Sequence, residues 1–233
     1  MRMKKRIVSL ALSIVLLLLL LVGCSGDDSS GTVPDSDWTP GQTSIKLLGG
    51  SWYAENGRVY VFYSVEETNK GARDADGSIM NITCLDEEGR GLDYQSKTVY
   101  PIAAGDTIRY SGSFNYIGRA PTSLDLRFTD NLGMYDFNDT VTRHSEFAIK
   151  DLHSSSDDKF YMLSGTVVNN SNVTQGVQIS AIFKRNGVII GGDSSPSDYP
   201  IEAGKSGTFT IYLPRVFETC NLSEVTVNAY FAH

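Results

Sequence analysis

One cysteine lies in a sequence context where its thiol can be modified chemically. Cys24 follows Gly23, an apolar run over residues 7–22, and a basic start over residues 2–6. Such a basic start, apolar middle and small residue before a cleavage point are typical of a secretory signal peptide. The apolar run has 16 residues, whereas a membrane-spanning helix needs about 20. The pattern therefore favours export and cleavage over the alternative of a transmembrane helix.

The residues Leu21-Val22-Gly23-Cys24 resemble the lipobox of bacterial lipoproteins. The resemblance implies that residues 1–23 are a lipoprotein signal peptide and that the Cys24 thiol carries a diacylglyceryl group. We expect this covalent lipid to be the only cofactor. Two acyl chains hold a protein stably in a bilayer, because each buried CH₂ adds about 0.8 kcal/mol. We therefore expect a membrane-anchored protein on the extracytoplasmic face, with an ordinary secretory signal without lipid as the alternative.

The rest of the sequence lacks the patterns of an enzyme or of a metal site. His144, His153 and His233 do not form a paired-ligand motif, and neither a GxSxG elbow nor a phosphate-binding glycine loop occurs. The stretch Asp74-Ala75-Asp76-Gly77-Ser78 resembles part of a calcium loop, but the twelve-residue pattern fails at its first and last positions. We expect an acidic turn there, no metal, and no enzymatic activity.

Aromatic residues near the middle of the chain are the candidate binding residues. Tyr116 is expected in a loop after a strand around Phe114, and Tyr135 and Phe137 lie between the two halves of the chain. Aromatic side chains often anchor binding surfaces because they bury a large area. The alternative is that these residues pack two domains against each other.

Charge and cysteine content exclude further classes. Removal of residues 1–23 takes away four of the 20 basic residues and none of the 27 acidic ones, which leaves a formal charge of −11. Such an acidic chain does not suit nucleic acid, whose phosphates require a basic surface. Cys84 and Cys220 lie in different halves of the chain. We expect buried free thiols rather than a disulfide framework.

An internal repeat divides the chain. Residues 100–105 recur at 199–204 with five of six identities at an offset of 99. Residues 65–69 also align with 167–171, at an offset of 102. Matched blocks in the same order indicate two copies of one domain.

The repeat defines the expected domain boundaries. Residues 24–43 are rich in Ser, Gly, Asp, Thr and Pro, a composition that cannot bury a core. We expect them to be a flexible tether. The first domain is then expected at residues 44–130, a connector at 131–144, and the second domain at 145–233.

Both copies have the features of β-strands. Residues 58–65 and 159–168 are rich in β-branched and aromatic side chains, and residues 177–183 partly alternate. Asn186-Gly187 is a strong hairpin signal because both central residues of a type I′ turn need positive φ. Several short strands in about 90 residues fit an immunoglobulin-like β-sandwich. The predicted fold is all-β, with two such sandwiches in tandem.

The order of strand, Asn-rich turn, alternating strand, Gly hairpin and x-Ala-Gly bend resembles the FxLYD-type domains of bacterial extracytoplasmic lipoproteins. The resemblance is clearest over residues 159–213. It implies a fold and a location but no catalytic residues. We expect a non-enzymatic module that binds a protein or another component of the cell envelope. The alternative is a lipoprotein that binds carbohydrate or another small ligand.

Overall fold

The computed structural model describes residues 43–75, 78–129, 141–197 and 199–230. All of them belong to one compact unit of the chain. Within these ranges the secondary structure is twelve β-strands and two short 3-10 segments, without an α-helix. Cys24, Tyr135 and Phe137 lie outside the described residues.

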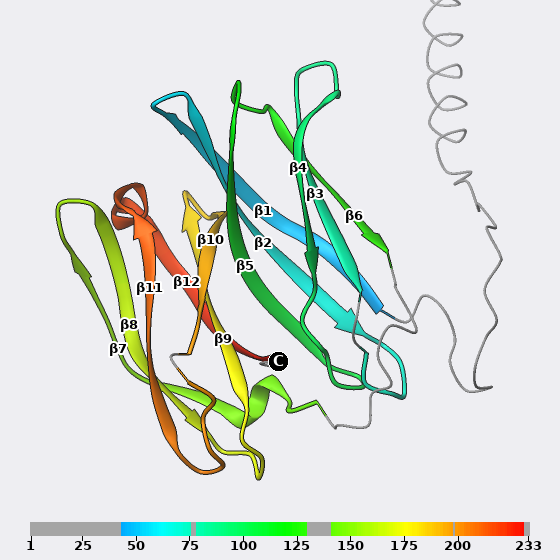
Figure 1. The fold of residues 1–233 in the computed structure, drawn as a ribbon, viewed down its shortest axis with the longest axis vertical. Coiled ribbons are helices and arrows are strands. Elements are labelled where there is room, and N and C mark those ends of the chain that lie inside the picture. The colour runs from blue at the N-terminus through cyan, green and yellow to red at the C-terminus, as the bar shows by residue number, and fades with distance from the viewer. Residues whose placement is uncertain (1–42, 76–77, 130–140, 198, 231–233) are drawn as a thin grey trace, which may run out of the picture. The chain divides into compact units, whose positions relative to one another are not determined.

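The first half is a sandwich of two three-stranded antiparallel sheets, with strand orders β1-β2-β5 and β4-β3-β6 (Figure 1). Residues of β3 alternate between buried and half-buried, as a strand with one face on a core requires. The strands are β1 (Thr43–Glu55), β2 (Arg58–Asn69), β3 (Ile79–Leu85), β4 (Gly91–Thr98), β5 (Thr107–Ile117) and β6 (Ser123–Thr129).

The second half repeats this topology with the strand orders β11-β8-β7 and β10-β9-β12 (Figure 1). The prediction of an all-β fold with two tandem sandwiches is therefore confirmed. The elements are η2 (His144–Glu146), β7 (Phe147–Ser156), β8 (Phe160–Asn169), β9 (Gly176–Arg185), β10 (Val188–Pro196), β11 (Ser206–Pro214), η3 (Arg215–Thr219) and β12 (Asn221–Tyr230).

Two asparagines in equivalent positions define how the sequences of the two halves align with each other. The side-chain amide of Asn69 donates to the carbonyl oxygens of Arg73 and Ile102, at 2.8 and 3.3 Å. Asn169 makes the same two bonds in the second half, at 2.8 and 2.9 Å. These bonds place β2 and β8 at an offset of 100. The predicted offset of 102 for this block is wrong, because short β-branched segments resemble each other in several registers.

The repeated Tyr-Pro-Ile segment has the same structural role in each half. Ile102 and Ile201 are buried, and each forms an isolated antiparallel bridge, with Ala75 and Gln175 respectively. Their carbonyl oxygens are also acceptors for the two asparagine amides. Packing and hydrogen bonding therefore account for the identity of this motif between the halves.

Asn-Gly turns set the register of two hairpins. Asn186 and Gly187 have φ values of 53° and 82°, which confirms the predicted turn between β9 and β10. Asn56 and Gly57 have nearly the same values, 51° and 76°, and join β1 to β2. The strand predicted from residue 58 is therefore β2, and an additional strand, β1, precedes it.

Each half has its own apolar core. In the first half the largest fully buried side chains are Tyr63, Met80, Ile82, Ile102 and Tyr110. In the second half they are Leu163, Ile179, Ile182, Phe183, Phe209, Ile211 and Phe217.

The halves contact each other mainly through β10, which lies against β1, β2 and β5. Phe62 of β2 is 3% exposed and joins the second core, with its ring 5.0 Å from that of Phe217. The Ser51 hydroxyl donates to the carbonyl oxygen of Ile190 at 2.7 Å. A Cβ atom on Gly191 would lie 2.7 Å from the carbonyl carbon of Phe62. Glycine at this position thus permits the close approach of the two halves.

Candidate functional site

Tyr116 is not an exposed binding residue. It lies within β5, not in a loop after it, and is only 7% exposed. Its ring packs in a cluster with Val59 and Cys84, and its hydroxyl donates to the carbonyl oxygen of Arg119 at 2.8 Å. The alternation of β5 places Tyr116 on the core face, which corrects the prediction of a loop position.

Both described cysteines are free, as predicted. Cys84 is buried, and Cys220 is half-buried. Burial raises the pKa of the Cys84 thiol to about 11, because the apolar surroundings disfavour a thiolate. Cys84 is therefore a core residue and does not have the properties of a nucleophile.

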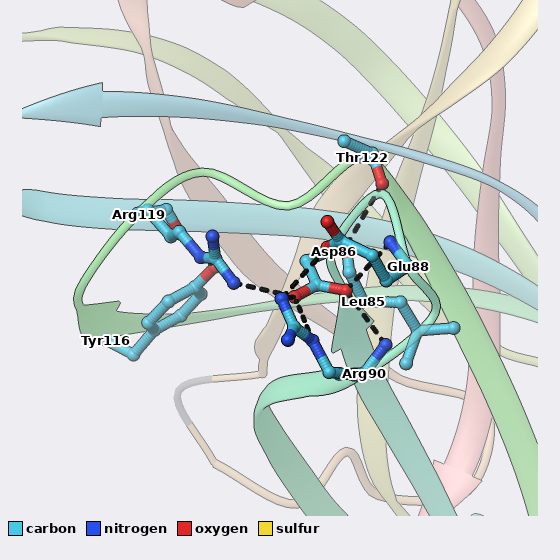
Figure 2. Close-up of polar contacts among 7 residues, drawn as sticks. All are labelled: Leu85, Asp86, Glu88, Arg90, Tyr116, Arg119 and Thr122. Carbon is cyan, nitrogen blue, oxygen red and sulfur yellow. Dashed lines mark hydrogen bonds and ion pairs between the residues drawn. The ribbon is translucent and has the colours of Figure 1, made fainter.

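The carboxylate of Asp86 organises the turn between β3 and β4 (Figure 2). Its Oδ1 accepts hydrogen bonds from the backbone amides of Glu88 and Arg90, at 3.0 and 2.9 Å. Its Oδ2 accepts hydrogen bonds from the guanidinium groups of Arg90 and Arg119, at 3.0 and 2.6 Å. The backbone amide and the guanidinium of Arg90, together with the backbone amide of Glu88, lower the pKa of Asp86 to about 2. All four bonds hold this turn, and the bond from Arg119 also ties it to the segment between β5 and β6.

The other chemically interesting residues also have structural partners. Asp74, in the stretch that resembles a calcium loop, accepts the backbone amides of Ala104 and Val141, both at 2.8 Å. His144 Nδ1 lies 3.0 Å from a carboxylate oxygen of Asp106. The described part of the chain contains no group of three or more His, Cys, Asp or Glu residues that could hold a metal ion.

Exposed apolar side chains gather on the outer face of the sheet β11-β8-β7. Phe160 and Tyr212 are 40% and 58% exposed, and their ring centroids are 5.8 Å apart in an edge-to-face arrangement. Tyr212 pairs with Met162 across the ladder, so both lie on this face. We call the surface formed by Phe160, Met162, Ser164, Thr210 and Tyr212 the β8–β11 face.

The β8–β11 face is the repeat counterpart of a surface that is buried in the first half. Strand pairing makes Met162 equivalent to Phe62, and Tyr212 equivalent to Ser113. Phe62 packs into the core of the second half, and the Ser113 hydroxyl donates to a carboxylate oxygen of Asp193 at 2.7 Å. The same position of the same fold is therefore covered by β10 in one half and exposed in the other.

A group of titratable residues lies near the boundary between the halves. The ammonium of Lys97 lies 3.4 Å from the Tyr100 hydroxyl and 5.4 Å from the centroid of that ring. Burial lowers the pKa of Lys97 and raises the pKa values of Tyr100 and Asp193, because each charged form loses solvation. Lys97 and Asp193 attract each other across the boundary between the halves. We attribute to this polar group a role in docking the halves.

The β8–β11 face was not recognised from sequence, although one signal was present. Tyr212 lies between the buried residues Ile211 and Leu213, so a large aromatic side chain occupies the outward position of an alternating strand. The equivalence of Tyr212 to Ser113 depends on strand register, which the structure supplies.

No family model matches the sequence, and the search of curated proteins found no match. Two solved structures resemble the chain weakly. A β-glucuronidase from glycoside hydrolase family 2 is 14% identical with a TM-score of 0.26, over 67% of this chain and 11% of that chain. The CBM22-1–CBM22-2 tandem domain of Paenibacillus barcinonensis Xyn10C is 10% identical with a TM-score of 0.20, over 84% of this chain and 93% of that chain.

This chain thus spans about a tenth of the length of the β-glucuronidase. Among the described residues, no helix has the length and apolar character needed to cross a membrane.

Proposed function

We propose that this protein is a lipid-anchored, extracytoplasmic module that binds another protein through its β8–β11 face. The observation that carries the proposal is the equivalence of this face to the surface by which the first half docks on β10. A face that supports tight docking once in the chain is presented again, with Met162 at the position of Phe62 and the larger Tyr212 at the position of Ser113.

The chemistry of the β8–β11 face supports a protein partner. Tyrosine, phenylalanine and methionine are enriched at the centres of protein interfaces, where they bury a large area. Ser164 and Thr210 lie next to them on the face and are half-buried, and their hydroxyls lie 3.0 Å apart. An apolar centre with a hydroxyl-rich margin resembles the anatomy of a standard interface.

We propose a binding role without catalysis. Asp86, Asp74 and His144 have the structural partners described above. The Cys84 thiol is buried with a raised pKa. A general acid, base or nucleophile would have to reach a substrate, and these groups instead hold turns or belong to the core.

Site-specific photocrosslinking in intact cells tests the β8–β11 face. A photoreactive phenylalanine analogue at Tyr212 should give a discrete crosslinked product with a partner protein. Tyr199 is the matched control, because it is a tyrosine of the second half that is 81% exposed and lies outside the face. Equal crosslinking at both positions, or none at Tyr212, would refute the proposal.

The anchor needs a separate test. Residues 21–24 support a lipid on the Cys24 thiol, and a Cys24→Ser variant would lack it. We expect mass spectrometry of the membrane fraction to show a mature chain that begins at Cys24 and carries diacylglyceryl. The variant should lack diacylglyceryl and retain residues 1–23. A native chain that retains residues 1–23, or that carries no lipid on Cys24, would contradict a lipid anchor.

A further inference from the structure

A surface cavity of about 230 Å³ lies where β5, η2 and β12 meet. Because a water molecule occupies about 30 Å³ in the liquid, the cavity has room for roughly seven or eight waters. It could therefore hold one group of the size of a single sugar ring. Its lining residues are all of polar types and consist of Thr107, Arg109, His144, Glu224, Thr226 and Asn228.

The cavity is built around a fixed arginine. The Arg109 guanidinium binds one carboxylate oxygen of Glu66 through Nε and Nη2, at 2.8 and 2.7 Å. Its Nη1 lies 3.4 Å from a carboxylate oxygen of Glu224. A guanidinium has five N–H donors, and these contacts use three of them. Two donors of a positioned group therefore remain for a ligand.

The backbone of Arg109 is held as firmly as its side chain. Its carbonyl oxygen is at the edge of the sheet β1-β2-β5, and it accepts the Thr226 hydroxyl at 2.7 Å and the Asn228 amide at 3.1 Å. Both donors belong to β12 of the second half. The cavity is thus formed by the docking of the halves, and each half supplies part of its lining.

One buried acceptor among the lining residues lacks a partner. Asn228 is 2% exposed, and its Oδ1 has no hydrogen bond within the described part of the chain. The amide orientation is fixed by the bond from its Nδ2 to the Arg109 carbonyl oxygen. A buried polar atom without a partner is costly, and such atoms commonly mark an ordered water.

We propose that this cavity binds a neutral polyhydroxyl group, the size of one sugar unit. Arg109 is paired with the carboxylates of both Glu66 and Glu224, so the lining does not favour an anion. A hydroxyl both donates and accepts, and the lining offers donors on Arg109 and acceptors on Glu224. Apolar ligands are disfavoured because they would leave these groups without partners.

The inferred site is distinct from the β8–β11 face, and either proposal can fail alone. We expect weak, millimolar affinity, since the lining has no Phe, Tyr or Trp ring on which a sugar could stack. The test is a ligand-observed NMR titration of the whole lipidated protein in detergent. The probes are glucose and N-acetylglucosamine, with inorganic phosphate and methylammonium as charged probes of similar or smaller size.

We expect saturable binding of at least one sugar, weakened at least about fivefold by Glu224→Ala. Glu218→Ala is the matched control, because Glu218 is also a glutamate paired with an arginine, Arg215, but lies outside the cavity. The thermal midpoint of each variant verifies folding. Thr107→Val provides a second variant of the lining and should also weaken binding.

Three results would overturn the proposal. One is the absence of saturable binding for both sugars. Another is sugar binding that Glu224→Ala and Thr107→Val leave unchanged in folded protein. The third is tighter binding of phosphate or methylammonium than of either sugar.

Discussion

The Ser113 hydroxyl donates to the Asp193 carboxylate over 2.7 Å, and this bond joins β5 of the first half to β10 of the second. The backbone amide of Ser194 donates to the other carboxylate oxygen at 2.9 Å. Both bonds favour the charged carboxylate, yet burial has the larger effect and raises the pKa of Asp193. Docking of the halves therefore places a carboxylate where ionisation is unfavourable.

The raised pKa of Asp193 makes stability depend on pH. Between the ordinary pKa of 3.8 and the higher folded value, the folded chain retains a proton that the unfolded chain has lost. The contribution of Asp193 to the free energy of unfolding is therefore largest in acid and is lost as pH rises through the folded pKa. Asp193→Asn should remove this dependence, as measured by urea unfolding across pH 3 to 8. Parallel pH profiles of the two proteins would contradict the prediction.

Phe62 and Met162 occupy equivalent positions in the two halves, but their side chains should contribute differently to the free energy of unfolding. Phe62 is buried against the second half, so Phe62→Ala should cost about 3–5 kcal/mol of unfolding free energy. Met162 is half-buried on the β8–β11 face, and Met162→Ala should cost about 1 kcal/mol or less. Chemical denaturation of the two variants measures the difference. Similar losses would show that the docking described here does not stabilise the chain.

Gly191 and Gly57 both have positive φ values, 96° and 76°, but differ in their surroundings. A Cβ atom on Gly57 would meet no atom within 4 Å, so Gly57→Ala should cost only the backbone penalty of about 1–2 kcal/mol. On Gly191 the added atom would also overlap the backbone of Phe62. We expect Gly191→Ala to lower the thermal midpoint substantially more. Equal shifts of the thermal midpoint in the two variants would mean that the halves can move apart at Gly191 without a loss of stability.

Asp86 should make the protein less stable as the pH falls, whereas Asp193 should make it more stable. The pKa of Asp86 is lowered to about 2, so its stabilising bonds are fully present above its ordinary pKa of 3.8. They are lost as pH falls through the folded value. The stability difference between the native protein and Asp86→Asn should therefore shrink from pH 5 to pH 2. A carboxyl resonance of Asp86 that titrates near 4 in NMR would contradict this assignment.

Local patterns were sufficient to predict the fold class. The β-branched segments at β2, β8 and β9 were recognised because a strand with one buried face alternates its side chains. The Asn-Gly turn after β9 was also predicted, since the φ values that it requires are a property of two residues alone. The same turn at residues 56–57 could have revealed β1.

The register of the strands and the exposure of individual side chains could not be predicted from local patterns. Tyr116 was expected in a loop, but the length of β5 and the phase of its pleat place the ring in a core. The offset between β2 and β8 was misjudged by two residues, because the hydrogen bonds of Asn69 and Asn169, not segment similarity, define it.

The sequence by itself thus determined that the chain forms two copies of a strand-rich fold, and it predicted an exported protein through residues 21–24. Only the tertiary structure decided that the surface around Phe62 is covered while its counterpart around Met162 and Tyr212 is exposed. The physical reason is that secondary structure follows from neighbouring residues. The partner of each outward face depends instead on contacts between strands, such as β5 and β10, that are far apart in the chain.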